Sequence, residues 1–493
     1  MTVTPTGSGS HSRKTHGAPR RRAYVETYGC QMNISDGELM EGILEASGYG
    51  IAASPEEADV ILVNTCAIRE HAEQRVLGRV SQLKGLKAER PGTILGVTGC
   101  MAQRMGEELV ARAPYVDLVM GPDGYRGLPE VLARLAGEAP GPGALIPDPV
   151  GGAPGKDAAA SRASRVTRRR GPSLTVLDLD TGENYEGLEQ RRSSGIAAWV
   201  PIKRGCDHRC TYCIVPYVRG PEKNRKPTEV LNEIAGLAGE GVTEVTLLGQ
   251  TVNSYRFDEW AFPELLRAVS RVPGIRRVRF TSPHPNDVTP ELVEVMATEP
   301  AVCEQLHLPV QAGSNRTLKR MLRRYTVESF LEKVERVREA IPDVALSTDV
   351  IVGFPGETDE EFEETLDLMR TVRFDDAFTY RFSPRDGTPA TRMPEEWTVP
   401  AAVGQARLER LIEVARGIQS EINRTEVGRV EEILIEKPGR DPGFMLGRTR
   451  RAKVVVVPGG PELIGSYRRA VLERTTGATF AGSLVEAPAA VVG

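Results

Sequence analysis

Six of the seven cysteines of this chain fall into two groups of three, and each group lies just beyond apolar stretches of sequence. One group shares a single short loop, GCDHRCTYC, with the spacing C-x3-C-x2-C: Cys206, Cys210 and Cys213. The other group is spread along the chain, 36 and then 34 residues apart, at the ends of YVETYGC, DVILVNTC and TILGVTGC: Cys30, Cys66 and Cys100. Thiols so far apart in sequence can meet if the strands before them end at one edge of a parallel sheet. This requirement restricts the fold more than any other feature of the sequence.

The length of 493 residues is too great for one hydrophobic core and indicates about three domains. Hydrophobic residues make up 40% of the chain and charged residues 26%, as is ordinary for a globular protein in water. The net charge of −4 does not mark the whole chain as a nucleic-acid binder, but it leaves room for local basic patches.

No apolar run reaches the roughly 18 to 20 residues needed to span a bilayer, so we expect no membrane association. The N-terminal segment MTVTPTGSGSHSRKTHGAPRRR is basic but lacks the apolar core of a secretory signal. An odd number of cysteines in a chain without an export signal argues against a disulfide framework. We therefore expect a cytoplasmic protein, in a reducing compartment where thiolates can hold metal.

Residues 1–22 carry no acidic residue and are predicted to form a disordered basic tail. Apolar runs then alternate with helix-like stretches through residues 23–137, which predicts a parallel α/β domain. We expect strands at Tyr24–Tyr28, Asp59–Asn64, Thr93–Val97 and Asp117–Met120. Helices are expected near Asp36–Ala46, Arg69–Leu86 and Gln103–Ala113. The following residues, 138–196, begin with a Pro/Gly/Ala-rich stretch and are interpreted as a linker.

A second α/β series fills residues 197–424, with six β/α units, two short of a complete eight-fold barrel. Its strands are expected at Ala197–Lys203, Glu244–Leu248, Arg277–Thr281, Gln305–Val310, Ala345–Ile351 and Ala377–Phe382. The last stretch, 425–488, has short β-type runs between Gly/Pro turns and is predicted to form a small β-barrel.

The loop of Cys206, Cys210 and Cys213 directly follows the first barrel strand, where the functional face of a β/α barrel lies. Three thiolates are one short of a closed zinc site or a fully ligated 4Fe–4S cluster, so one metal position stays open. The alternative is a zinc site with His208 as fourth ligand. It is disfavoured because mixed-ligand zinc sites combine separated knuckles.

The distributed cysteines allow two interpretations. Taken singly, each is more simply explained as a buried structural cysteine. Their repeated placement just past a strand of the same parallel sheet favours instead a second three-thiolate site. The seventh cysteine, Cys303, belongs to neither group and is predicted to be a buried packing residue.

Four motifs together resemble the methylthiotransferases, which belong to the radical S-adenosylmethionine superfamily: YGCQMNISDGELM, VNTCAIREHAEQRV, VTGCMAQR and GCDHRCTYCIVPYVRG. The resemblance extends from Ala23 to about Glu486. The motif sequences are closest to those of the branch that acts on tRNA. The branch that modifies a ribosomal-protein aspartate has the motifs GCPKN and NTCGF, where this chain has GCQMN and NTCAIRE. A third branch acts on threonylcarbamoyl-adenosine in tRNA, and the motif sequences argue against that branch as well.

The resemblance implies two 4Fe–4S clusters: one on the loop cysteines, exchangeable with S-adenosylmethionine, and one on the distributed cysteines. It implies no catalytic residue beyond these ligands. Tyr212 would lie beside the bound adenine, and Gln250 and Gln311 would line the cofactor pocket. The family tail is a TRAM domain, an RNA-binding β-barrel, and the basic cluster in this tail gives the expected RNA contacts: Arg448, Arg450, Arg451 and Lys453.

The implied function is methylthiolation of N6-dimethylallyladenosine beside the anticodon of tRNA. The expected partners are tRNA and a low-potential electron donor, flavodoxin or ferredoxin, and the expected state is a monomer. The alternative from another class is a non-catalytic RNA-binding module in which the cysteines hold structural zinc. That alternative predicts a colourless protein with stoichiometric zinc.

Overall fold

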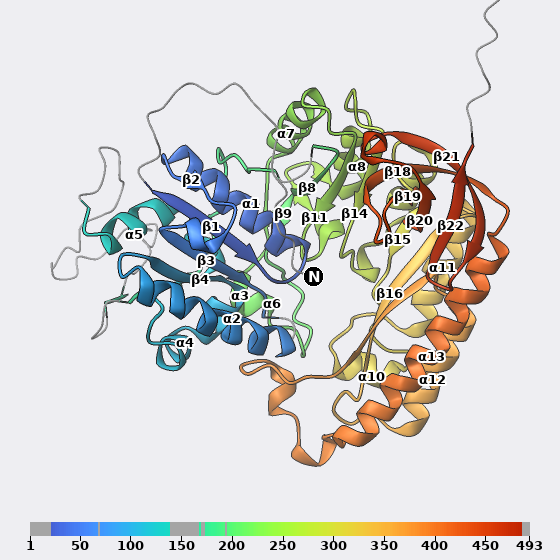
Figure 1. Ribbon diagram of the computed structural model, residues 1–493. Coiled ribbons are helices and arrows are strands. Elements are labelled where there is room, and N and C mark those ends of the chain that lie inside the picture. Colours follow the sequence, from blue (N-terminus) through green and yellow to red (C-terminus); the bar gives the residue numbers. More distant parts are fainter. Residues whose placement is uncertain (1–20, 68–69, 139–166, 169–172, 193–194, 486–493) are drawn as a thin grey trace, which may run out of the picture. The chain divides into compact units, whose positions relative to one another are not determined.

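The computed structural model describes residues 21–67, 70–138, 167–168, 173–192 and 195–485 (Figure 1). Most of the predicted basic tail, residues 1–20, lies outside the described residues, as do 139–166 and 169–172 of the predicted linker. The described chain forms two units. The first contains the residues up to 192 together with 203–208 and 214–225, and the second contains the remainder. No helix among the described residues combines the length and apolar character of a membrane span.

The first unit is built on a seven-stranded sheet in the order β2-β1-β3-β4-β5-β7-β6. All strands are parallel except the edge strand β6, which pairs antiparallel with β7. Their bounds are β1 Arg22–Thr27, β2 Gly50–Ile51, β3 Val60–Thr65, β4 Ile94–Gly99, β5 Leu118–Met120, β6 Thr167–Arg168 and β7 Leu174–Val176. The predicted parallel α/β domain is thus confirmed. The sheet also includes β6 and β7, which lie within the stretch predicted to be a linker.

Helices cover both faces of this sheet (Figure 1). On one face α1 and α5 pack against alternate strand residues, and on the other α2, α3 and α4 pack against the residues between them. The bounds are α1 Gln31–Ala46, α2 Glu70–Glu89, α3 Cys100–Met105, α4 Glu107–Arg112 and α5 Leu128–Leu135. Near-continuous apolar strands such as VILVNT are explained by this burial on both sides. The single helix expected at Gln103–Ala113 is split by Gly106, whose φ of +48° interrupts the helix.

A short later segment of the chain also belongs to the first unit. It comprises β9 (Lys203–Arg204), α6 (Val215–Arg219) and β10 (Lys223–Asn224), with β9 and β10 paired antiparallel. Apolar side chains of α6 pack on the α/β domain in a small cluster of Ala67, Cys100, Ile214 and Val218. This segment therefore brings residues on both sides of the cysteine loop to the N-terminal sheet.

The second unit contains six parallel barrel strands in two groups, β14-β11-β8 and β15-β16-β17, joined by a bridge between Val278 and Val302. Their bounds are β8 Ala197–Pro201, β11 Glu244–Leu248, β14 Arg277–Phe280, β15 Gln305–His307, β16 Ala345–Val352 and β17 Asp376–Arg381. The helices between and after them are α7 Pro227–Gly239, α8 Phe262–Ser270, α9 Pro290–Thr298, α10 Asn315–Arg320, α11 Val327–Ala340, α12 Asp359–Val372 and α13 Ala401–Thr425. The six predicted β/α units are all present. A short β12–β13 hairpin (Arg256–Phe257 and Trp260–Ala261) was not predicted.

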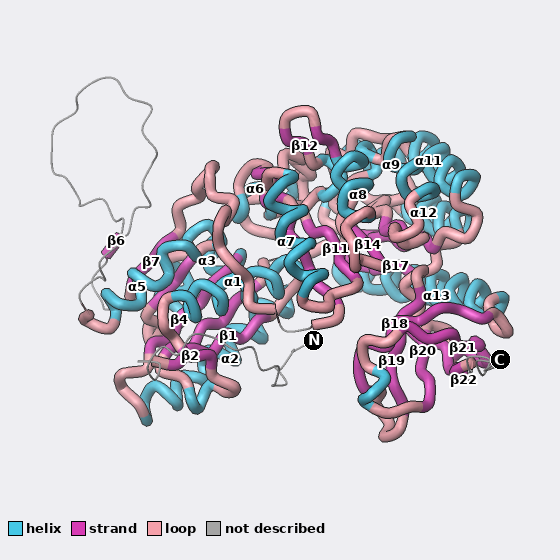
Figure 2. Tube along the Cα trace, turned by 90° about the horizontal axis from the view of Figure 1, so that it is seen from above, coloured by secondary structure: helices cyan, strands magenta, loops and turns pink. Residues whose placement is uncertain are grey.

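Beyond α13 the chain closes a five-stranded barrel in the order β18-β19-β20-β22-β21 (Figure 2). The strands are β18 Val430–Pro438, β19 Phe444–Thr449, β20 Val454–Pro458, β21 Tyr467–Thr475 and β22 Thr479–Leu484. Its small core is made of alternate strand residues such as Ile433, Val455 and Phe480. The predicted C-terminal β-barrel is confirmed.

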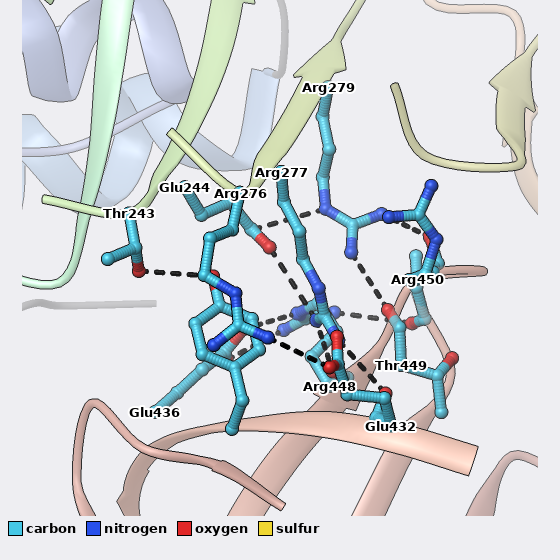
Figure 3. Close-up of polar contacts among 12 residues, drawn as sticks. Thr243, Glu244, Arg276, Arg277, Arg279, Glu432, Glu436, Arg448, Thr449 and Arg450 are labelled. Atoms are coloured by element: carbon cyan, nitrogen blue, oxygen red, sulfur yellow. Dashed lines mark hydrogen bonds and ion pairs between the residues drawn. The ribbon is translucent and has the colours of Figure 1, made fainter. Parts of the chain in front are cut away.

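Arginines of β14 join this small barrel to the β/α strands (Figure 3). Arg277 is fully buried and donates to the backbone oxygens of Arg448 (2.8 Å) and Glu432 (2.9 Å). Arg279 donates to the backbone oxygens of Arg450 (2.7 Å) and Thr449 (2.8 Å). These guanidinium groups donate charge-assisted hydrogen bonds to four backbone oxygens of the small barrel, so we expect them to stabilise its docking.

We predict that Arg277→Met destabilises the second unit by about 1–3 kcal/mol, because the substitution removes the hydrogen bonds to the backbone oxygens of Arg448 and Glu432. The neighbouring Arg276 has a side chain that is 51% exposed and pairs with the same Glu432. Arg276→Met is therefore the matched control and should cost less than about 1 kcal/mol. Urea unfolding measures both, and equal midpoints for the two variants would contradict this assignment.

Candidate metal centres

The distributed cysteines lie together at the C-terminal edge of the N-terminal sheet, because the strands before them end level. In the strand register Thr27 pairs with Asn64, and Thr65 pairs with Gly99. Cys66 and Cys100 each come directly after a strand, and Cys30 comes three residues after the last residue of β1. The expectation that this triad converges thus has a direct structural basis in the register.

The contacts among these cysteines are close. A hydrogen bond with Cys66 lowers the pKa of the Cys30 thiol to about 6, and Cys30 Sγ also lies 3.2 Å from Asn33 Oδ1. Cys30 caps the N-terminus of α1 and Cys100 begins α3. Burial raises the pKa of Cys100, and the positive charge of Arg219 opposes this effect. A hydrogen-bonded thiol pair with a third thiol beside a cation is a donor set that fits a cluster held by three thiolates.

Two glycines allow the strand ends to approach so closely. Gly99 has φ +93°, and a Cβ there would lie 2.5 Å from both Asn64 Oδ1 and the Thr65 oxygen. Gly29 has φ +141°, and a Cβ there would lie 2.6 Å from Cys66 Cβ. The glycines that precede Cys30 and Cys100 are therefore required by the packing of the site.

Three charged side chains surround Cys100 within the first unit. Arg219, at the end of α6, donates from Nε to Cys100 Sγ (3.1 Å) and from Nη2 to Asp36 Oδ2 (2.6 Å). Arg204 of β9 lies 2.7 Å from Asp36 Oδ1. Although burial opposes ionisation, the two guanidinium groups hold the pKa of Asp36 below its ordinary value.

The loop cysteines are divided between the units. Cys206 belongs to the first unit, and its backbone N–H donates to the Gly220 oxygen (3.2 Å). Gly205, with φ +76°, is needed here because a Cβ would lie 1.9 Å from the Pro221 oxygen. Cys210 and Cys213 belong to the second unit, where the Cys213 N–H donates to the Cys210 oxygen (3.0 Å).

Arg323 is the charged partner of the loop cysteines in the second unit. Its guanidinium donates to Cys210 Sγ (3.3 Å) and to the Pro309 oxygen (3.1 Å), and its side chain is buried. Tyr325 lies beside it, with its hydroxyl donating to the Val310 oxygen (2.7 Å). A buried guanidinium that donates to a cysteine sulfur is the kind of contact that orients a metal ligand.

The residues predicted to line the cofactor pocket lie on the C-terminal side of the barrel strands. Tyr212 packs edge-on against Phe354, with ring centroids 6.4 Å apart. Gln250 follows β11, and its buried Oε1 has no hydrogen-bond partner among the described residues. Gln311 is buried with φ +73° and exchanges backbone hydrogen bonds of 2.8 Å with β16. A strained residue and an unpaired amide oxygen on one barrel face are typical of a ligand site.

The four basic residues predicted to contact RNA are all paired with acidic residues of the second unit. The pairs are Arg448–Glu436 (2.7 Å), Arg450–Glu304 (2.8 Å), Arg451–Glu426 (2.8 Å) and Lys453–Asp375 (2.7 Å). Arg451 and Lys453 are also buried. Their role at RNA stays a prediction, and their observed contacts are within the protein.

Sequence reasoning did not find Asp36, Arg204, Arg219 or Arg323. Each is one charged residue among many, and the contact partner of each is more than 100 residues away in sequence. The available signal was position, because Arg219 follows the cysteine loop directly in the motif CIVPYVRG. The seventh cysteine, Cys303, is buried, as expected for a packing residue.

Three family models match successive parts of the chain. Residues 22–121 match a family described as "Uncharacterized protein family UPF0004". Residues 200–369 match the radical SAM superfamily, and residues 424–485 match the TRAM domain.

Curated relatives align over most of the chain. One from Carboxydothermus hydrogenoformans is 44% identical over 90% of this chain and 94% of its own length. One from Thermoanaerobacter sp. is 44% identical over 94% of this chain and 92% of its own length. One from Mycobacteroides abscessus is 41% identical over 90% and 84%. All three are named tRNA-2-methylthio-N(6)-dimethylallyladenosine synthase.

Among solved structures, the radical S-adenosylmethionine methyltransferase TsrM from Kitasatospora setae superposes with a TM-score of 0.52 at 14% identity. The match covers 86% of this chain and 80% of that one. The cobalamin-dependent radical enzyme OxsB gives a TM-score of 0.51 at 14% identity, over 80% of this chain and 56% of that one. At this identity the likeness concerns the fold alone.

We predict that Gly99→Ala displaces Cys100 and lowers the iron content of the anaerobically reconstituted protein. The new methyl group meets backbone and amide atoms that cannot move aside, and its positive φ adds about 1–3 kcal/mol of strain. Gly48→Ala is the matched control, because Gly48 has φ +89° in open space. Iron analysis and thermal unfolding of both variants test this, and equal iron in Gly99→Ala and Gly48→Ala would contradict it.

Proposed function

This chain belongs to the family of tRNA-2-methylthio-N6-dimethylallyladenosine synthases, which are radical S-adenosylmethionine enzymes, and we propose that it carries out the family reaction. The substrate is tRNA with N6-dimethylallyladenosine beside the anticodon, and the product carries a 2-methylthio group. We propose two 4Fe–4S clusters, one on Cys206, Cys210 and Cys213 and one on Cys30, Cys66 and Cys100.

The chemistry of the substrate explains why two metal centres are needed. Carbon 2 of the adenine bears a hydrogen that is not acidic and offers no leaving group, so acid–base catalysis alone cannot replace it with sulfur. A cluster held by Cys206, Cys210 and Cys213 would provide the electron for reductive cleavage of S-adenosylmethionine, and one held by Cys30, Cys66 and Cys100 would provide the sulfur. A further S-adenosylmethionine provides the methyl group.

The observation that carries this proposal is the convergence of three cysteines at the end of the N-terminal sheet. A parallel α/β domain does not need thiols at three adjacent strand ends for its stability. The glycines that precede Cys30 and Cys100 are placed where any side chain would clash, so the backbone is arranged around the thiols. This arrangement supports a working metal centre and disfavours three isolated packing cysteines.

In this scheme the chain's own residues bind and orient the cofactor and the substrate. Tyr212, Gln250 and Gln311 are proposed to line the S-adenosylmethionine pocket, in which the open Oε1 of Gln250 is an acceptor for an ammonium or hydroxyl group. The adenosine is presented from an unstacked loop, as sequence-specific RNA recognition requires. The electron comes from flavodoxin or ferredoxin, and the enzyme acts as a monomer.

We predict that replacing Cys30, Cys66 and Cys100 together by Ala keeps reductive formation of 5′-deoxyadenosine and abolishes methylthiolation of tRNA. The loop cysteines remain in place in this variant, so cleavage of S-adenosylmethionine needs nothing that was removed. Chromatography of the small molecules and of digested tRNA measures both products. Thiolated nucleoside from this variant would show that the sulfur does not pass through this site.

The TRAM barrel is proposed as the part that tracks the tRNA backbone. The four predicted contacts, Arg448, Arg450, Arg451 and Lys453, compete with their acidic partners for this role. We extend the proposal to cations on β18, β21 and the loop after β18 that are exposed and have no ion pair among the described residues: Lys437, Arg440, Arg468, Arg469 and Arg474. Free surface cations are the groups that release counterions from nucleic acid.

We predict that Arg468→Gln with Arg469→Gln weakens binding of an anticodon stem-loop and lowers the salt dependence by about 0.7–0.9 log–log units per charge. Arg448→Gln is the paired counterpart, and it should change the slope by less because its charge is already offset by Glu436. Fluorescence anisotropy over a salt series measures the slopes. A full loss of slope in Arg448→Gln with none in the exposed pair would assign the contacts to the paired residues instead.

A further inference from the structure

The buried side chains beside Cys100 carry an excess of positive charge. Arg219, Arg204 and Asp36 have side chains that are 4%, 6% and 0% exposed. Two guanidinium groups facing one carboxylate leave one positive charge in excess, away from water. A buried charge without a counterion is costly, so such a group requires an anion beside it.

The geometry shows which groups face this charge. Asp36 is shared, with one oxygen toward Arg204 (2.7 Å) and the other toward Arg219 (2.6 Å). Arg219 also directs its Nε at Cys100 Sγ, 3.1 Å away. Cys30 is the other cysteine that faces the charge of Arg219.

We propose that Arg219 is a positioning residue for the cluster on the distributed cysteines. It donates a charge-assisted hydrogen bond to the Cys100 thiolate, orients this ligand, and offsets the negative charge of the cluster. Hydrogen bonds to ligand sulfurs and net local charge set the reduction potential of an iron–sulfur cluster. A cation stabilises the reduced, more negative form, so Arg219 raises the potential of this cluster.

The place of Arg219 in the chain adds a second consequence. It lies at the end of α6, and the oxygen of the next residue, Gly220, accepts the N–H of Cys206 (3.2 Å). One turn of chain therefore contacts a ligand of each triad: the backbone of Cys206 and the sulfur of Cys100. Asp36 and Arg204 hold this turn in place from α1 and β9.

This inference rests on the proposed second cluster, so its test begins from a background with that cluster alone. In this background Cys206, Cys210 and Cys213 are replaced by Ala, and anaerobic reconstitution is followed by iron analysis. Absence of any iron in the background would reject the second cluster itself. Retained iron provides the starting point for the Arg219 variants.

The reduction potential of the remaining cluster is then measured by titration with dithionite, followed by electron paramagnetic resonance. Arg219→Gln removes the excess charge and leaves the Arg204–Asp36 pair balanced, so the fold should persist. We expect at least a tenfold shift of the oxidised-to-reduced ratio toward oxidised, which is about 59 mV more negative for a one-electron couple. Arg219→Lys, which keeps the charge but not the planar donor group, should fall between Arg219→Gln and the parent.

Arg104→Gln is the matched control. Arg104 lies on α3, four residues after Cys100, and is paired with Glu73 at 2.6 Å. Its removal should leave the potential unchanged. A parental potential in Arg219→Gln would overturn the proposal, as would an equal shift in Arg104→Gln, since the effect would then be a general one of charge. If Arg219→Gln takes up no cluster, Arg219→Lys decides: a lowered potential supports the proposal and an unchanged one contradicts it.

Discussion

The level ending of the parallel strands β1, β3 and β4 is the constraint on which the N-terminal site depends. Their register is fixed by strands buried on both faces, and a slip of one residue would exchange these two faces. Because the register holds, residues directly after the strands emerge side by side. Cysteines there meet without any motif linking them in sequence. This close approach requires glycine at the positions before Cys30 and Cys100.

A shared electrostatic feature recurs at the two groups of cysteines. In the first unit Arg219 donates to Cys100, and in the second unit Arg323 donates to Cys210. Both arginines are buried, and ionisable neighbours raise the pKa of each well above its ordinary value despite burial: chiefly Asp36 at Arg219, and Tyr212 and Tyr325 at Arg323. Each unit thus provides one permanent cation to one cysteine sulfur. In the proposed clusters, metal affinity and reduction potential would depend on residues beyond the cysteines themselves.

The sequence alone was sufficient for most strands and for the convergence of Cys30, Cys66 and Cys100, and insufficient for the partners of charged residues. Strands such as Val60–Thr65 and Ala345–Val352 were predicted closely, because local apolar patterns determine them. The convergence of the cysteines followed from the direction of parallel strands. The basic cluster after β19 was predicted to be an RNA surface, yet its charges meet Glu304, Asp375 and Glu426. No local sequence pattern predicts those ion pairs, because the partners come from other elements.

The most direct test of the two-centre account is Mössbauer spectroscopy of the wild-type protein, enriched with iron-57 and purified without oxygen, combined with metal and sulfide analysis. The account predicts a brown protein with about eight irons and eight sulfides per chain, four for each cluster, all in 4Fe–4S form. A colourless protein with stoichiometric zinc, or a single cluster with the distributed cysteines left as free thiols, would contradict it.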